Sequence, residues 1–179
     1  MSRVLLDACV LYPTVLREIL MGAADRGFFT PVWSARILEE WARAAARLGA
    51  NGEAVARGEI ALLRAVHPEA EVTYSFDLQR EIELPDADDA HVLAAAVAGG
   101  ADELLTFNLR DFPGRVLAGY GILPRGPDEF LLELFHNEAG FIEVLEAVRV
   151  RTEKISGREQ PMRALLKRLR LPRLGKAVG

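Results

Sequence analysis

Apolar residues recur along the chain either in short continuous runs or with helical spacing, and the two kinds of segment alternate. Apolar runs at residues 3–6 and 103–107 predict buried strands, and an alternating run at 72–76 predicts a third. Helical spacing predicts helices at about residues 13–27, 35–49, 52–66, 85–99, 128–135, 138–150 and 161–171. Because helices separate the strands, we expect an α/β fold with three α/β/α layers and a central, mostly parallel sheet.

The residues between these segments indicate where the helices begin and end. Pro31 is expected in a turn leading to Ser34, whose hydroxyl is suited to cap the helix at 35–49. Gly99 and Gly100 are expected to end the helix at 85–99. A boundary near Ser156 would divide the chain into a domain at 1–155 and a helical C-terminal extension at 156–179.

Charge is distributed unevenly along the 179 residues. Residues 151–179 carry nine Lys or Arg and two Glu, a charge of +7, whereas residues 1–150 carry −11. A basic extension on an acidic body favours a polyanion or an acidic partner near the C-terminus, and a merely solvated tail is the alternative.

Several classes of protein are disfavoured by what the sequence lacks. The single cysteine, Cys9, excludes an intramolecular disulfide framework and a cysteine-based zinc cluster. Without a signal-peptide core or a long apolar run, we expect a cytoplasmic protein with no membrane partner. No glycine-rich phosphate loop or Gly-x-Ser-x-Gly elbow is present, which argues against nucleotide-binding folds and serine hydrolases.

Acidic and amide side chains stand where predicted strands end and where a predicted helix begins. They are Asp7 after the first strand, Asn108 and Asp111 after the strand at 103–107, and Asp86, Asp88 and Asp89 at the helix start. Each has an ordinary explanation when taken alone, as a turn former or as a complement to a helix dipole. Taken together, they predict a cluster at the edge where parallel sheets bind ligands.

Helical geometry adds Glu40 to this set. At about 100° per residue, Glu40 lies roughly 95° from the centre of the apolar face of helix 35–49, whereas Glu39 lies about 165° away, in solvent. Glu40 can therefore lean over the edge of the sheet. Carboxylates that converge repel one another unless a cation joins them, and an oxygen-rich site suits Mg²⁺ or Mn²⁺. Such ions can activate a water for in-line attack on phosphorus.

Four segments together resemble the motifs of PIN-domain ribonucleases, the family of the VapC toxins of type II toxin–antitoxin systems. The segments are residues 5–11, Ser34 with Glu40, residues 84–96 and residues 106–112. They occur in the family's order and spacing over roughly residues 3–130. The resemblance implies a PIN-like α/β fold for the domain at 1–155.

The resemblance also implies roles for particular residues. Asp7, Glu40 and Asp89 would be the core metal-site acids for Mg²⁺ or Mn²⁺, and Asp86 is counted with them as a metal-site residue. The family's fourth position falls on Asn108, with Asp111 close by, so one of these two would complete the catalytic set.

The first functional hypothesis is therefore a metal-dependent endoribonuclease that hydrolyses RNA phosphodiesters. As a VapC-like toxin it would form a homodimer and would be blocked by an antitoxin. A second hypothesis is a PIN-like module that binds RNA or protein with little nuclease activity, and Asn108 is the feature that supports it. A third, a metal-dependent phosphatase for small molecules, has no specific support. His91 lies in the third motif, where a role in helix packing is expected.

Overall fold

The computed structural model describes residues 1–179, and its centre is a five-stranded sheet in which all neighbouring strands are parallel. In chain order the strands are β1 (Arg3–Leu6), β2 (Thr30–Ser34), β3 (Glu71–Val72), β4 (Glu103–Leu105) and β5 (Leu123–Arg125). They lie in the order β3-β2-β1-β4-β5, so the chain builds outward in one direction from β1 and later in the other. The crevice between the ends of β1 and β4 is the kind of position where open parallel sheets bind ligands.

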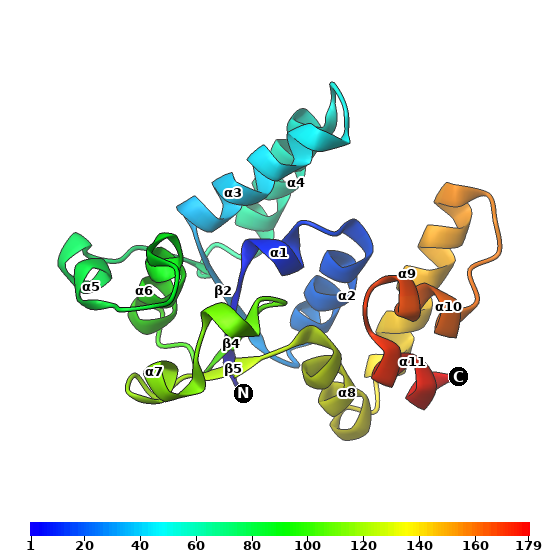
Figure 1. The fold of residues 1–179 in the computed structure, drawn as a ribbon. Coiled ribbons are helices and arrows are strands. Elements are labelled where there is room, and N and C mark those ends of the chain that lie inside the picture. Colours follow the sequence, from blue (N-terminus) through cyan, green and yellow to red (C-terminus); the bar gives the residue numbers. More distant parts are fainter.

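Eleven α-helices surround the sheet. They are α1 (Ala8–Leu11), α2 (Thr14–Asp25), α3 (Ala35–Ala45), α4 (Gly52–Val66), α5 (Phe76–Glu81), α6 (Ala90–Ala98), α7 (Gly114–Ala118), α8 (Pro127–Asn137), α9 (Phe141–Ser156), α10 (Met162–Arg168) and α11 (Pro172–Val178). α6 packs against β1, β2 and β4 with α5 beside it, and α2 and α8 lie on the other side of the sheet (Figure 1). The three-layer α/β/α prediction is confirmed, and the sheet is wholly parallel.

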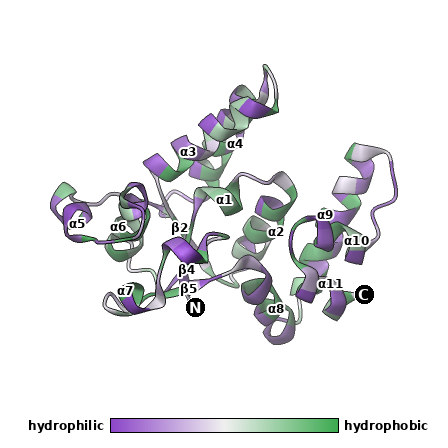
Figure 2. Cartoon of the chain, viewed as in Figure 1, coloured by the Kyte–Doolittle hydropathy of each residue, from purple (hydrophilic) through white to green (hydrophobic).

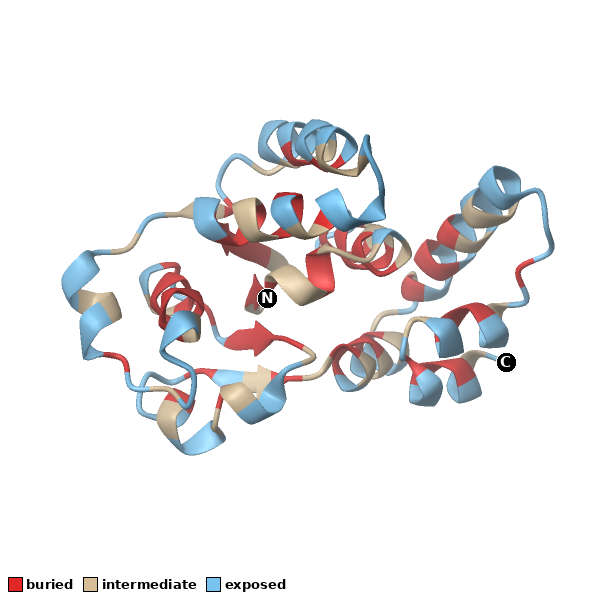
Figure 3. Ribbon diagram, turned by 45° about the horizontal axis from the view of Figure 1, so that its top comes forward, coloured by how far each residue is buried: buried red, intermediate tan, exposed pale blue.

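The core is continuous from the sheet into the helices on both sides. The apolar residues of β1 and β4 are fully buried, and the buried parts of Figure 3 coincide with the strands and the inner faces of α2 and α6. Hydropathy follows the same division, with apolar residues on inward faces and polar residues outside (Figure 2). Trp33 and Trp41 are both buried in this core. None of the helices is both long and apolar enough to cross a membrane.

Pro31 lies in β2, so the predicted turn at this position is wrong. Thr30 donates its backbone N–H to Ser2 on the β1 side, whereas Trp33 donates to Ala70 on the β3 side. By this alternation the nitrogen of Pro31 faces β3, which begins only opposite Trp33. No hydrogen bond is lost, and a proline is tolerated in an inner strand for this reason.

The predicted strand at 72–76 is also wrong over most of its length. β3 ends at Val72, and Ser75 caps α5 by accepting the N–H of Leu78 at 3.1 Å. Phe76, which the alternation counted as a strand residue, is 69% exposed in the first turn of that helix. A local cap therefore prevailed over the alternating pattern.

The helix predicted at 85–99 begins later than expected. A single 3₁₀ turn, Ala87–Asp89, precedes α6, and Asp86 supports this turn by accepting the N–H of Asp88 at 2.9 Å. The helices at 52–66 and 35–45 follow the prediction closely, and Ser34 caps the latter by accepting the N–H of Ile37 at 3.2 Å.

The C-terminal extension forms two helices that pack on the body. α11 packs against α8, while α10 packs against α9 and α11. Leu166, Leu171 and Leu174 are fully buried and belong to the same apolar core as the sheet. Asp128 at the start of α8 accepts the N–H groups of Arg173 and Leu174, both at 2.9 Å, which satisfies the first turn of α11. The division at Ser156 stays a prediction, and the structure places it at the end of α9.

Candidate active site

Asp7 is the centre of a polar cluster at the carboxyl ends of β1 and β4. It leaves β1 in an extended conformation and caps α1, because its Oδ1 accepts the N–H of Ala8 at 2.8 Å. Its Oδ2 accepts the hydroxyl of Thr106 at 2.8 Å and the thiol of Cys9 at 3.5 Å. The side chain is buried, and burial raises its pKa despite these hydrogen bonds, with the charge of Glu40 adding to the rise.

Thr106 is a member of this site that the sequence analysis did not single out. It is fully buried just after β4, and its hydroxyl both donates to Asp7 and accepts the N–H of Asn108 at 3.0 Å. One side chain therefore ties the ends of β1 and β4 together. The available signal was a hydroxyl residue near the end of an apolar run, two positions before Asn108.

Glu40 reaches the site from α3, and a buried histidine holds it. Its Oε1 lies 2.7 Å from Nε2 of His91, which is buried on α6, so the two side chains are in close polar contact. Nδ1 of His91 has no partner. His91 thus packs within α6 as expected, and it also positions Glu40, a role that the sequence analysis missed.

Glu39 faces away from the site, as the angular argument predicted, but it is not simply solvated. Its carboxylate accepts two hydrogen bonds from Arg57 on α4, both at 2.9 Å, and one from Arg43 at 3.2 Å. These partners lower the pKa of Glu39 to about 2, the bond from Arg57 being the largest cause. Glu39 therefore joins α3 to α4, and Glu40 faces α6.

Asp89 is the site residue whose pKa is raised by the largest number of other acids. It stands at the start of α6, and its pKa is raised to about 6, first by partial burial and then by the charges of Asp86, Asp7 and Asp111. His91 partly offsets this rise. The fold has thus gathered carboxylates from three separate stretches of the chain. The influence of Glu40 on Asp7 adds a fourth.

The two candidates for the fourth motif position, Asn108 and Asp111, lie differently relative to the carboxylates. Asp111, in the 3₁₀ turn Leu109–Asp111, is close enough to raise the pKa of Asp89. Asn108 is exposed, and its side chain lines a groove beside Cys9. Of the two, only Asp111 adds its charge to the carboxylate cluster. Asp88 is exposed and contributes only its backbone N–H, to Asp86.

The donor set fits a hydrated hard cation better than a closed metal cage. No three His, Cys, Asp or Glu side chains are grouped closely enough to hold an ion among themselves. Mg²⁺ and Mn²⁺ suit oxygen ligands, and Mg²⁺ commonly takes one or two carboxylates and keeps several waters. The mutual repulsion that raises the pKa of Asp89 is what a cation would relieve. Cys9 offers no thiolate, because burial and then Asp7 raise its pKa to about 12.

Comparison with known proteins agrees with this geometry. The family model described as "PIN domain" matches residues 3–110, more than half of the chain. A protein of Mycobacterium tuberculosis (strain ATCC 25618 / H37Rv) named "Putative ribonuclease VapC50" is 49% identical over 45 residues, which cover 25% of this chain and 27% of that protein. The matched region is thus about a quarter of that relative's length. No solved structure gives a significant match. With its parallel sheet, its acids at the ends of β1 and β4 and this family match, the chain belongs to the PIN domain family.

Proposed function

We propose that this protein is an Mg²⁺- or Mn²⁺-dependent endoribonuclease that hydrolyses RNA phosphodiester bonds. The observation that carries the proposal is the environment of Asp89, whose pKa is raised to about 6 by partial burial and then by the charges of Asp86, Asp7 and Asp111. A cluster of like charges is costly to a fold, and it is useful where a cation and a phosphate are to be held together. The PIN family match and the partial match to a ribonuclease support the same reading.

In this proposal Asp7, Glu40 and Asp89 would hold a hydrated cation, with Asp86 and Asp111 supplying further negative field. The bound cation would supply charge neutralisation at the phosphate and would make an attacking water more acidic. Thr106 keeps Asp7 oriented, and His91 keeps Glu40 turned toward Asp7. The reaction adds water to phosphorus and breaks one phosphorus–oxygen ester bond, leaving a phosphate on one fragment and a hydroxyl on the other. The exposed amide of Asn108 is available to contact the RNA strand.

Incubation with total cellular RNA, with and without Mn²⁺, tests this proposal when the new RNA ends are mapped. We expect Mn²⁺-dependent cleavage by the parent protein and a loss of at least about a hundredfold in Asp7→Asn, which removes one charge and one cation ligand. Asp88→Asn is the matched control, because Asp88 is an exposed acid in the same motif as Asp86 and Asp89. An Asp7→Asn protein that cuts RNA at the parent rate would contradict the assignment.

The biological role that we propose is that of a toxin in a toxin–antitoxin pair, acting as a homodimer. The partial likeness to a protein named VapC50 supports this role. Induced expression should then arrest bacterial growth, and expression of Asp7→Asn should not. Light scattering on the purified protein would report a mass of about two chains. Equal growth with both proteins would contradict the toxin role. A monomeric mass would contradict the homodimer.

Two observations favour the alternative of a binding module with little activity. No three potential ligands are grouped for a metal, and Asn108 replaces an acid at the fourth motif position. The RNA-cleavage experiment separates the two functions, because a binding module would retain RNA in a gel shift and produce no new ends with Mn²⁺.

A further inference from the structure

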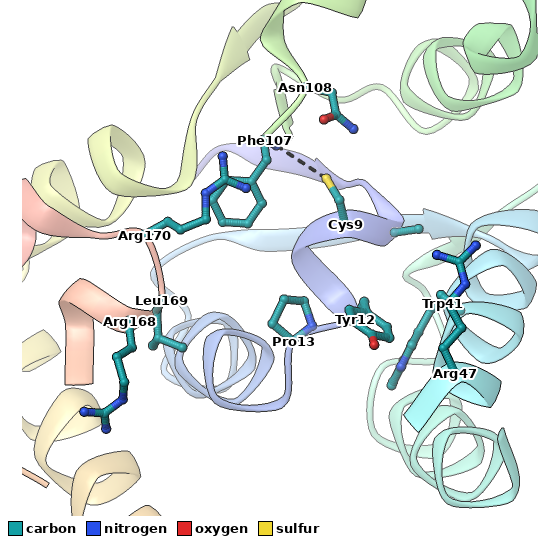
Figure 4. A pocket seen from close by; sticks show the side chains of 12 residues that line it. Cys9, Tyr12, Pro13, Trp41, Arg47, Phe107, Asn108, Arg168, Leu169 and Arg170 are labelled. Carbon is teal, nitrogen blue, oxygen red and sulfur yellow. Dashed lines mark hydrogen bonds between the residues drawn. The ribbon is translucent and has the colours of Figure 1, made fainter. Parts of the chain in front are cut away.

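A groove of about 520 Å³ lies between the body and the C-terminal extension, beside the carboxylate cluster. We call it the tail groove, and the lining residues used below are Cys9, Tyr12, Arg47, Phe107, Asn108 and Arg170. Figure 4 shows Arg47 and Arg170 on opposite sides, with Tyr12 between them. Because Cys9 contacts Asp7 and Asn108 follows β4, the groove opens onto the proposed site of cleavage.

The tail groove is cationic although the body around it is acidic. Arg47 and Arg170 are exposed and take part in none of the ion pairs of the structure, which satisfy many of the other arginines. A third arginine of the lining, Arg168, donates to the side chain of Gln160 and also has no acidic partner. Unpaired guanidinium groups on both sides of a groove are the arrangement that binds phosphates.

The backbone of Arg170 is in a conformation that favours glycine. Its φ is 64°, and it is the one non-glycine residue with positive φ in the chain. Arg170 donates its N–H to Lys167 and Leu171 donates to Leu166, which is the hydrogen-bond pattern of a Schellman motif ending α10. An arginine at the position that glycine usually takes costs about 1 kcal/mol. Strain of this kind is typical of a side chain retained for its chemistry.

Aromatic surfaces complete the groove. The guanidinium carbon of Arg170 lies 4.4 Å from the ring centroid of Phe107, and Tyr12 is partly exposed on the other side of Cys9 (Figure 4). Single-stranded nucleic acids bind to cationic grooves in which aromatic rings and guanidinium planes stack on unpaired bases. In a duplex these base faces are already covered.

We propose that the tail groove binds a single-stranded stretch of the RNA substrate next to the cleaved bond, with Arg170 and Arg47 on successive phosphates and Phe107 and Tyr12 against the bases. This proposal rests on the proposed ribonuclease function and assigns its substrate as unpaired RNA. Charge complementarity and continuity with the carboxylate cluster favour an RNA strand over a peptide as the occupant.

Arg170→Gly is the sharpest variant, because glycine adopts the native backbone without strain while the side chain and its guanidinium are removed. Lys167→Ala is its charge-matched control, since Lys167 is exposed one turn earlier on α10 and does not line the groove. Arg47→Gln tests the opposite side. The probe is a fluorescent 12-nucleotide single-stranded RNA, titrated in EDTA at several salt concentrations so that binding is measured without cleavage.

We expect Arg170→Gly and Arg47→Gln to weaken binding roughly tenfold each, the loss of one charged hydrogen bond. The slope of log affinity against log salt should become shallower by about 0.7 for each lost phosphate contact. Lys167→Ala should bind as the parent does. Arg170→Gly should melt at or slightly above the parent Tm, because it relieves the backbone strain at this position. Paired RNA of the same length should bind more weakly and should respond little to either arginine variant.

Parent-like affinity and salt slope in Arg170→Gly would overturn the proposal and would point to another occupant, such as a peptide. A lowered Tm with an unchanged salt slope would likewise overturn it in favour of a structural role for Arg170. The outcome for the proposed function is separate. Arginine-dependent binding without Mn²⁺-dependent cleavage supports the groove and contradicts the nuclease, whereas cleavage that Arg170→Gly leaves unchanged contradicts the groove alone.

Discussion

At the scale of single residues, the site is a set of carboxylates whose repulsion is controlled by a few neutral or cationic neighbours. Thr106 and the N–H of Ala8 stabilise Asp7, and His91 stabilises Glu40. Asp89 has the least support of the three, because the 3₁₀ turn before α6 leaves its side chain without a capping hydrogen bond. The burial and repulsion that raise its pKa are therefore offset only in part, by His91.

The raised pKa of Asp89 gives a prediction for the metal-free protein. Folding raises this pKa from 3.8 to about 6, so its contribution to stability is complete below pH 3.8 and is lost as the pH rises through about 6. Asp89→Asn stays neutral and should gain stability relative to the parent between pH 4 and pH 7. In EDTA we expect its Tm advantage to grow by about 2–4 °C over this range.

Differential scanning calorimetry at both pH values measures this difference. Asp88→Asn is the control, since Asp88 is the exposed neighbour in the same turn, and its Tm should follow the parent curve. A Tm difference between Asp89→Asn and the parent that stays constant from pH 4 to pH 7 would contradict the raised pKa of Asp89.

At the scale of elements, short connections deliver the site residues to one edge of the sheet. α1 begins directly after its N-cap Asp7, and α3 begins directly after its N-cap Ser34, the last residue of β2. The cap at Ser34 fixes where α3 starts and hence the direction in which Glu40 points. The strand-to-helix junctions therefore position the carboxylates of Asp7 and Glu40.

Replacement of this cap gives a prediction for α3. Ser34→Ala leaves the N–H of Ile37 unsatisfied in a buried position and should lower the unfolding free energy by about 1 kcal/mol. Chemical denaturation measures the change. Ser75→Ala is the matched control, because Ser75 caps α5 in the same way, yet α5 has no buried residue and its start is exposed. Equal losses of unfolding free energy in the two variants would contradict a larger contribution from the buried cap at Ser34.

At the scale of the whole molecule, the basic extension is part of the folded body. Leu165, Leu166, Leu171 and Leu174 are buried, three of them in the main core cluster. The extension also carries Arg170 to the rim of the groove beside the carboxylates. The acidic body and the basic extension therefore meet at the proposed substrate site, which is how a protein of net charge −4 could bind a polyanion.

Removal of the extension tests this integration. Truncation after Ser156 exposes apolar surface on α8 and α9 and discards buried leucines that contribute roughly 1.5–3 kcal/mol each. We expect a markedly lower Tm or an insoluble product, measured by thermal denaturation beside the full chain. A truncated protein that melts at the parent temperature would show that the extension is an independent tail.

The family match confirms the resemblance seen in the motifs, and much of the fold was predictable because its signals are local. The helix at 52–66, the cap at Ser34 and the apolar run of β1 depend on neighbouring residues alone. β2, β5 and α11 were missed. In β2 and β5 a proline obscures the strand, and only pairing with a neighbouring strand makes the segment extended.

What the sequence by itself determined is therefore the fold class, the apolar faces and a short set of acids at strand ends and a helix start. The tertiary structure alone decided which of these acids interact, because pKa shifts depend on burial and on charges from distant segments. It also decided that Thr106 and His91 hold the carboxylates in place and that Arg170 stacks on Phe107. Such contacts join residues far apart in the chain, and no local pattern encodes a distance between them.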